Sequence, residues 1–300
     1  MKKVVGVSIG SAKRDHAIKV DLLGTKFDIK RVGTDGSLQK AKDLLKKLDG
    51  KVDAFGLGGI DLYFVADAKK YVIRDANKLK KAVKKTPIVD GSGLKHTLER
   101  HTIKYLIENN VLPLKEKTVL MVAAVDRFGM AEALHQAGCK IIFGDLIFGL
   151  GIPIPLRSYK SFRILAKMLL PVVTKLPFKV LYPTGSSQEK QSTKNQRYFN
   201  EADIIAGDFL IIRKYLPQSL EGKYIITNTT TAEDVKILKE RGLKSLITTT
   251  PVFEGRSFGT NVMEATLVAL MEKSPEQIKP QDYLEYIKKL NFKPRIEIFC

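Results

Sequence analysis

The sequence has no tryptophan and few residues of the kinds that bind metals, with two cysteines and four histidines in 300 residues. Cys139 and Cys300 lie far apart in the chain, so they form neither a disulfide framework nor a zinc-ligand spacing, which fits a reducing cytoplasm. His96 and His101 stand five positions apart and do not share a helix face as paired ligands would. The sequence therefore predicts no metal site.

Long apolar runs are also absent. The longest, at 119–125 and 141–150, have the length of strands or are broken by Gly and Asp, and neither approaches the roughly 20 residues that span a bilayer. The first residues place two lysines before a short apolar stretch that soon meets Gly10, which indicates a strand rather than a signal peptide. We therefore expect a cytoplasmic protein with no membrane partner.

Acidic residues are outnumbered, with 32 Asp and Glu against 51 Lys and Arg and a net charge of +19. Such a charge raises nucleic acid as a partner. The lysines, however, are spread over the short stretches 40–51, 69–85 and 288–293, with no aromatic stacking ladder between them. We expect a solvated basic surface that attracts a small anionic polyhydroxy substrate or a phosphate-bearing cofactor, and not a nucleic-acid-binding protein.

The sequence is rich in short strands alternating with helices. In the first part, the patterns predict strands at 4–9, 17–22, 27–32, 52–57, 63–66, 71–74 and 87–89, and helices at 38–48 and 78–84. A helix over 93–108 then leads to a βαβ unit, with a strand at 118–125, a helix at 129–137 ended by Gly138 and a strand at 140–143. The same rhythm continues with strands at 179–182, 204–205, 224–227 and 245–248, and helices at 232–241, 261–271 and 282–290.

This alternation predicts an α/β fold with a Rossmann-like, doubly wound parallel sheet and a second, smaller α/β domain. We expect residues 1–92 to form the smaller, substrate-binding domain and residues 93–272 to form the nucleotide-binding domain. The tail, residues 273–300, is expected to pack on the first domain, and a homodimer is compatible with this organisation.

The turn between the strand at 118–125 and the following helix stands where dinucleotide-binding domains hold a pyrophosphate. Of the usual glycines only Gly129 is present, and Asp126 brings a carboxylate that Arg127 offsets only in part. The candidate cofactor-binding residues of this turn are Ala123, Ala124, Asp126, Arg127, Phe128 and Gly129.

Further candidates for the cofactor site follow other strands of the same part. Asp145 comes about 20 residues after the turn, where an acid accepts hydrogen bonds from a ribose hydroxyl and repels a 2′-phosphate, which favours NAD over NADP; the alternative is a capping or surface aspartate. Gly207 and Asn228 each follow a predicted strand, at the sheet edge where ligands gather.

Several motifs together resemble the shikimate and quinate 5-dehydrogenases. The segment from Val89 to Leu94 is similar to that family's Thr-Asp-Gly-x-Gly motif, and it precedes a helix and a βαβ unit as it does there. Thr250-Pro251 and the run from Gly259 to Ala265 are similar to the family's Thr-Pro and Gly-x-x-Met-x-x-Gln-Ala patterns. The resemblance covers about residues 85–272, with the motifs in the same order.

The resemblance implies roles for individual residues. Asp90 matches the catalytic aspartate, which works with a lysine; by position the lysine is Lys69 or Lys70, although the family's lysine motif is missing here. Glu264 stands in place of a substrate-binding glutamine, and a carboxylate at that position accepts hydrogen bonds without donating them.

A separate group of polar residues follows the first predicted strand. Ser8, Ser11 and Lys13 offer hydroxyl and cationic donors that suit a substrate carboxylate. An ordinary capped turn with solvated charges explains the same residues.

The main hypothesis from these patterns is an enzyme, an NAD(P)-dependent dehydrogenase that moves a hydride between NAD(P) and a cyclic hydroxy acid of the quinate or shikimate type. The alternative is a non-catalytic ligand-binding or regulatory protein on the same fold that has lost cofactor binding.

Overall fold

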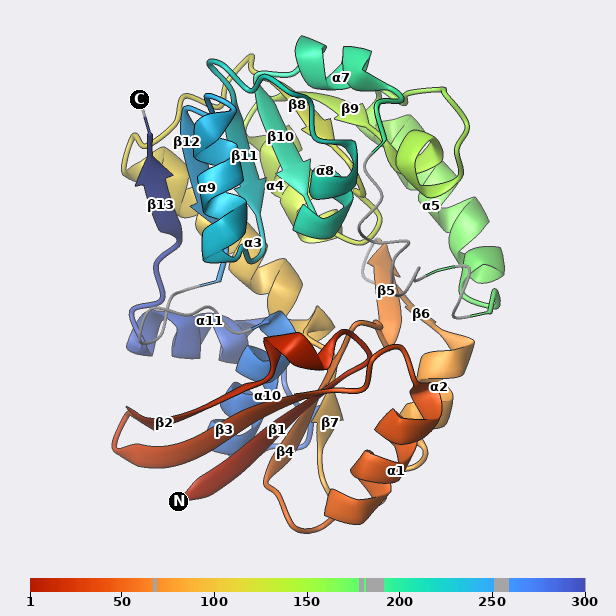
Figure 1. The fold of residues 1–300 in the computed structure, drawn as a ribbon, viewed down its shortest axis with the longest axis vertical. Coiled ribbons are helices and arrows are strands. Elements are labelled where there is room, and N and C mark those ends of the chain that lie inside the picture. Colours follow the sequence, from red (N-terminus) through yellow and green to blue (C-terminus); the bar gives the residue numbers. More distant parts are fainter. Residues whose placement is uncertain (67–68, 178–180, 182–191, 251–258, 300) are drawn as a thin grey trace.

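The computed structural model describes residues 1–66, 69–177, 181, 192–250 and 259–299. These residues form two parts, each built around a mainly parallel sheet, and the two lie one above the other in Figure 1. Helix α3 (Ser92–Glu108) leads from the first part into the second. The predicted two-part α/β architecture is therefore confirmed.

The first sheet has the strand order β2-β3-β1-β4-β7. Only β2 runs antiparallel to its neighbour; the other strands are parallel. The bounds are β1 (Lys2–Ser8), β2 (His16–Leu22), β3 (Thr25–Gly33), β4 (Ala54–Gly58) and β7 (Ile88–Val89). Strands β5 (Tyr63–Ala66) and β6 (Lys69–Val72) form a separate antiparallel pair, and a short 3-10 turn, η1 (Ala12–Arg14), follows β1.

Both faces of the first sheet are covered by helices. Successive strand residues alternate between the faces, so Val5 packs with α1 (Leu38–Leu48) and α2 (Arg74–Lys80) while Val4 packs with α10 (Thr260–Met271) and α11 (Pro280–Lys289). Two segments from the far end of the chain thus complete the core of the first part.

Glycines in the strands let α10 approach the first sheet closely. A Cβ built at Gly56 in β4 would lie 2.6 Å from the carbonyl oxygen of Asn261, at the start of α10. A Cβ at Gly6 in β1 would lie 2.5 Å from Cγ2 of Val262. The absence of a side chain at these positions sets the distance between helix and sheet.

We therefore expect Gly56→Ala to lower the free energy of unfolding by about 1–3 kcal/mol, because the helix backbone has to move away from the sheet. Gly149→Ala is the matched control, since a Cβ there meets no atom within 4 Å. Urea unfolding of both variants measures the difference. Equal stability of the two variants would contradict this account of how α10 packs.

The second sheet has the order β13-β12-β11-β10-β8-β9, and every pair is parallel except β12 with β13. The bounds are β8 (Thr118–Met121), β9 (Lys140–Phe143), β10 (Ile204–Gly207), β11 (Tyr224–Thr227), β12 (Ser245–Thr248) and β13 (Arg295–Ile298). Strand order reverses between β8 and β10, which is where ligands bind in doubly wound sheets. Only β9 lies beyond β8, whereas the Rossmann dinucleotide-binding arrangement has two strands there.

Helices cover both faces of this sheet as well. One face packs against α3, α4 (Phe128–Gln136) and α5 (Tyr159–Val173); the other packs against α7 (Gln196–Glu201), α8 (Phe209–Tyr215) and α9 (Ala232–Glu240). A π-turn, η2 (Asp145–Gly149), follows β9. Within the described ranges, no helix combines the length and apolar character that crossing a bilayer requires.

Several sequence predictions need correction. The strand predicted over 118–125 ends at Met121, because the chain turns there towards α4. Helix α10, predicted as part of the second domain, packs on β4 and β1 of the first sheet, and the tail contributes β13 to the second sheet as well as α11 to the first part. The strand predicted at 179–182 lies almost wholly outside the described residues. The domain limits themselves stay a prediction.

Candidate functional site

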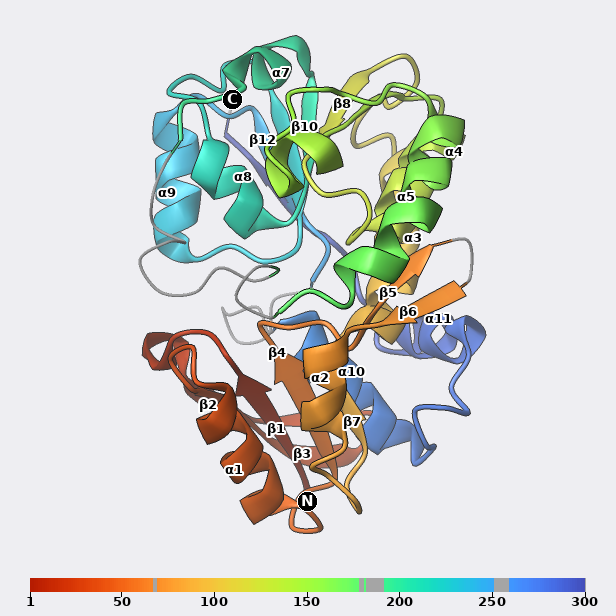
Figure 2. The same ribbon diagram turned by 90° about the vertical axis from the view of Figure 1, so that its right-hand side faces the viewer.

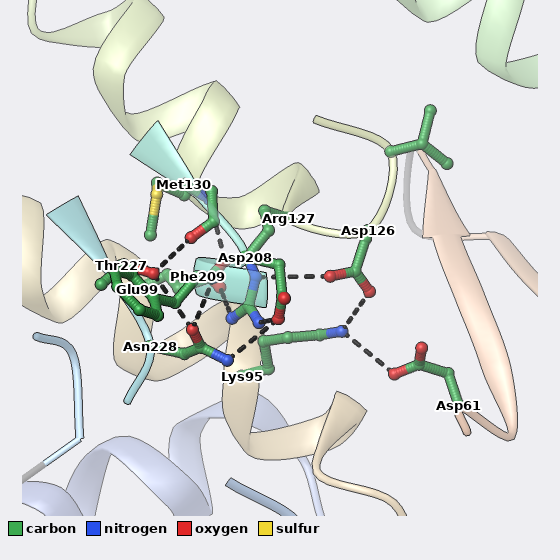
Figure 3. A network of polar contacts seen from close by, with 12 residues as sticks. Asp61, Lys95, Glu99, Asp126, Arg127, Met130, Asp208, Phe209, Thr227 and Asn228 are labelled. Carbon is green, nitrogen blue, oxygen red and sulfur yellow. Dashed lines mark hydrogen bonds and ion pairs between the residues drawn. The ribbon is translucent and has the colours of Figure 1, made fainter. Parts of the chain in front are cut away.

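The segments that follow the parallel strands of the two sheets meet around one lysine (Figure 3). Lys95 lies on the first turns of α3, and its side chain is only 8% exposed. Its Nζ is 3.2 Å from Oδ1 of Asp61, which follows β4 of the first sheet, and 2.7 Å from Oδ1 of Asp126, which follows β8 of the second. A buried ammonium group thus joins the carboxyl edges of the two sheets.

A second buried cation extends this network into the second part of the chain. The guanidinium of Arg127 donates to Glu99 at 2.8 Å and to Asp208 at 2.9 Å, and its Nε lies 3.3 Å from Asp126. Arg127 and Glu99 are almost fully buried, with 5% and 1% of their side chains exposed. Helix α3 thus supplies one of the two cations, Lys95, and an acid that pairs with the other, Glu99.

Asp208 and Asn228 close the network at the ends of β10 and β11. Nδ2 of Asn228 donates to Asp208 at 3.0 Å, while its Oδ1 accepts from the backbone N–H of Phe209 and from the hydroxyl of Thr227. Asp208 also caps α8 by accepting from the N–H of Leu210 at 2.9 Å. Hydrogen bonds to the backbone and to neighbouring side chains therefore fix both Asp208 and Asn228 in place.

The electrostatics of the network follow from this arrangement. Burial opposes ionisation of Asp126, but Lys95 and Arg127 outweigh it and hold the pKa of Asp126 at about 2. Burial also raises the pKa of Glu99 despite the opposing effect of Arg127. Asp61, Asp126 and Asp208 keep 19%, 22% and 22% of their side chains exposed. The three aspartates are therefore more accessible than the two cations that pair with them.

A second buried group of acids lies where the chain first crosses between the two parts. Oδ2 of Asp90 accepts from the N–H of Leu62 and the hydroxyl of Ser92, both at 2.6 Å, and Oδ1 accepts from the N–H of Ser92. Glu264 is 2% exposed and accepts a 2.6 Å hydrogen bond from the hydroxyl of Tyr283. Asp90 thus caps the start of α3, and no described contact joins it to Lys69 or Lys70.

Burial, with a contribution from Asp90, raises the pKa of Glu264 to about 8. A pKa near 8 favours the protonated form at neutral pH, and a protonated carboxyl group is able to donate a hydrogen bond as well as to accept them. The expectation that this position only accepts hydrogen bonds assumed an ionised carboxylate, and it stays a prediction.

The predicted pyrophosphate turn is occupied by contacts within the chain. Ala124 and Phe128 are core residues, Ala123 stands beside them in the turn, and the N–H of Gly129 donates to His96 at 3.2 Å. A Cβ at Gly129 would lie 2.8 Å from the carbonyl oxygen of His96, so this glycine serves the close packing of α4 on α3. Burial lowers the pKa of His96 to about 3, so the ring is neutral and accepts this hydrogen bond.

Other predicted positions are also engaged elsewhere. Asp145 accepts a 2.9 Å hydrogen bond from the N–H of Val125, in the turn after β8, and burial raises its pKa to about 6. Gly207 ends β10, and its φ of +134° brings the chain close to Val122. The ammonium groups of Lys69 and Lys70 lie over the rings of Tyr71 and Tyr63.

The polar residues after β1 form a capped turn. The hydroxyl of Ser8 accepts from Arg31 at 3.0 Å, and the hydroxyl of Ser11 accepts from the N–H of Lys13 at 3.2 Å. Lys13 is exposed. These contacts correspond to the capped-turn alternative for Ser8, Ser11 and Lys13.

Comparison with protein families assigns the larger part of the chain. Residues 93–299 match the model described as Domain of unknown function (DUF8754), and residues 3–90 match the one described as Domain of unknown function (DUF8753). The chain belongs to the DUF8754 family. No match to a curated protein was found.

The solved structures that resemble the chain are distant. A glucose-galactose binding protein from Geobacillus stearothermophilus is 10% identical with a TM-score of 0.39, and the match covers 99% of this chain and 97% of that one. A sugar ABC transport substrate-binding protein from Bordetella parapertussis is 13% identical with a TM-score of 0.38, covering 89% and 78%. A glutamate dehydrogenase from Thermus thermophilus is 12% identical with a TM-score of 0.43, covering 97% and 74%. Similarity at this level assigns no function.

These comparisons correct the sequence interpretation. The predicted membership in the shikimate and quinate 5-dehydrogenases was wrong, because the family models that match residues 93–299 and 3–90 are others. The hypothesis of an NAD(P)-dependent oxidoreductase falls with it. The roles given to Asp90, Lys69 and Lys70 came only from that resemblance. NAD binding and the cytoplasmic location stay predictions.

Sequence reasoning missed the residues that join the two parts. Asp61, Lys95 and Glu99 were not singled out, although Asp61 comes shortly after a segment with a strand pattern. Its position after a parallel strand was a usable signal. The apolar periodicity of α3 gave no signal for Lys95 and Glu99, because their burial depends on oppositely charged side chains from segments distant in the sequence.

Proposed function

We propose that this chain is a non-catalytic ligand-binding or regulatory protein that holds a small polyhydroxylated molecule where the carboxyl edges of its two sheets meet. The observation that carries the proposal is the position of Lys95, which is buried between Asp61 of the first part and Asp126 of the second. Both acids keep part of their side chains accessible, so a molecule at this junction contacts both parts at once.

The chemistry of the accessible atoms indicates the class of ligand. Carboxylate oxygens accept hydrogen bonds from hydroxyl groups, and each accepts more than one. The three partly exposed aspartates have six such oxygens, of which five already contact Lys95, Arg127, Asn228 or the N–H of Leu210. Buried cations fix the orientation of these carboxylates before a ligand arrives, which lowers the entropy lost on binding. An array of this kind suits a neutral sugar or polyol.

The same array disfavours an anion. Lys95 and Arg127 are 8% and 5% exposed, so a ligand at the junction meets the carboxylates and not the cations. A carboxylate or phosphate of the ligand would lie beside negative charge. We therefore propose a polyhydroxylated ligand, as the sequence predicted, but one that is uncharged rather than anionic.

A thermal-shift screen followed by calorimetry tests this proposal. We expect a neutral sugar or cyclic polyol to raise the midpoint of thermal unfolding and to bind measurably, while quinate, shikimate, NAD and NADP do not. Asp208→Asn and Asp61→Asn should each weaken binding about 10- to 150-fold, as expected from the loss of one charged hydrogen-bond acceptor worth about 1.5–3 kcal/mol.

Glu221→Gln is the matched control, because this exposed glutamate lies in a turn of the second part away from the network. It should bind the ligand as the wild type does. Binding of NAD or of an anionic acid in the absence of any polyol binding would overturn the proposal.

A further inference from the structure

One helix of the second part carries apolar side chains on both of its faces. Phe162, Ala166 and Leu170 of α5 are buried, and the ring of Phe162 stacks on that of Phe143 at 4.4 Å between centroids. The opposite face exposes Ile164, Met168 and Val172, at 51%, 68% and 62%. Helix α5 thus carries apolar side chains on two opposite faces, and the described residues leave the outer one exposed to solvent.

The outer face is a continuous stripe, because Ile164, Met168 and Val172 are spaced four residues apart. The segment that leads into the helix also exposes Leu150, Ile152 and Ile154. Half of the large apolar side chains exposed by the described residues therefore fall between residues 150 and 172. Figure 2 views the molecule from the side on which α5 lies outermost.

The charged residues of α5 and of the segments beside it in the sequence have a single sign. The sequence contains no acidic residue between Asp145 and Glu189. Within α5 and the turn after it, the exposed charged residues are Lys160, Arg163, Lys167 and Lys175, in a chain whose net charge is +19. Apolar side chains flanked by cations are the pattern of helices that lie in the interface of an anionic bilayer.

From this combination we propose that the outer face of α5, defined by Ile164, Met168 and Val172 with the flanking lysines, binds peripherally to an anionic lipid surface. This departs from the sequence expectation of no membrane partner, which considered spanning segments. A second copy of the chain fits this face poorly, because it would bring cations against cations with no acid among residues 146–188. The proposal is independent of the polyol site.

Sedimentation with lipid vesicles tests the proposal on the full chain. We expect the protein to pellet with vesicles of phosphatidylcholine containing about 30% phosphatidylglycerol and to stay in solution with pure phosphatidylcholine. The triple variant Ile164→Gln, Met168→Gln, Val172→Gln should lose at least about tenfold in the partition coefficient. Lys160→Gln with Lys175→Gln should weaken binding at low salt, and the difference from the wild type should shrink as salt is raised.

Two sets of control substitutions distinguish vesicle binding through this face from binding through the net positive charge of the protein. Leu23→Gln, Ile107→Gln and Ile298→Gln remove three exposed apolar side chains elsewhere, and Lys40→Gln with Lys293→Gln remove two charges elsewhere. Both controls should bind as the wild type does, and all variants should keep its unfolding midpoint to within a few degrees.

Three results would overturn the proposal. The wild type could fail to pellet with anionic vesicles at low salt. The triple variant could bind as tightly as the wild type, which would reduce the effect to net charge. The protein could instead dimerise in solution through this face without binding vesicles, which would make a second copy the occupant.

Discussion

Replacing Arg127 with methionine is expected to lower the free energy of unfolding by about 3–5 kcal/mol, because it leaves the buried carboxylate of Glu99 without its cation. Asp126 and Asp208 lose a partner in the same step. The loss of stability should be largest above neutral pH, since Glu99 can relieve part of its cost by taking up a proton. Urea unfolding at pH 6 and pH 8 measures both effects.

The matched control is Arg100→Met. Arg100 pairs with Glu132 at 2.7 Å, but both side chains are substantially exposed, so its loss should cost at most about 1 kcal/mol. The double variant Arg127→Met, Glu99→Leu should regain part of the lost stability, because it removes the unpaired buried charge. If Arg127→Met is as stable as Arg100→Met, the buried network does not hold the two edges as described.

Glu264 should make the protein less stable as the pH rises from about 5 to about 8. Its pKa is raised to about 8 in the folded protein, above an ordinary value of 4.5, so the folded state binds the proton more tightly than the unfolded state does. The stabilising contribution is complete below the ordinary pKa and is lost as the pH rises through the folded one. Each tenfold difference in proton affinity between the folded and unfolded states corresponds to about 1.4 kcal/mol, which gives a loss of several kcal/mol across this window.

Glu264→Gln isolates this contribution from those of other buried acids. Glutamine keeps the shape and hydrogen-bonding groups of a protonated glutamate without titrating, so the variant should gain stability relative to the wild type between pH 6 and pH 9. Glu272→Gln, on an exposed residue just past the end of α10, should leave the pH profile unchanged. Parallel profiles of the wild type and Glu264→Gln would contradict a neutral buried Glu264.

Much of the fold was predictable because local patterns agree with the final structure. The helix at Leu38–Leu48 and the strands Tyr224–Thr227 and Ser245–Thr248 were predicted with their observed bounds. The helix has one apolar face, and the two strands are short apolar runs bounded by turns. Helix α5 was missed because apolar residues lie on both of its faces, which hides the helical period, and Pro171 stands inside it.

The candidate site was less predictable because it depends on contacts between distant segments. Strand β13 pairs with β12, which lies about 50 residues earlier in the sequence. Lys95 pairs with Asp61, which precedes it in the sequence, and with Asp126, which follows it. Asp145 lies just after β9, where the sequence placed it, but its side chain accepts a hydrogen bond from the N–H of Val125. Sequence position identified the correct sheet edge, whereas the direction of each side chain required the packed structure.

A crystal structure of the protein with the neutral sugar or polyol that binds most tightly is the most direct test of the central claim. We predict that hydroxyl groups of the ligand lie within hydrogen-bonding distance of carboxylate oxygens of Asp61, Asp126 and Asp208, with Lys95 still paired behind them. A ligand bound elsewhere, with these three aspartates solvated, would contradict the claim.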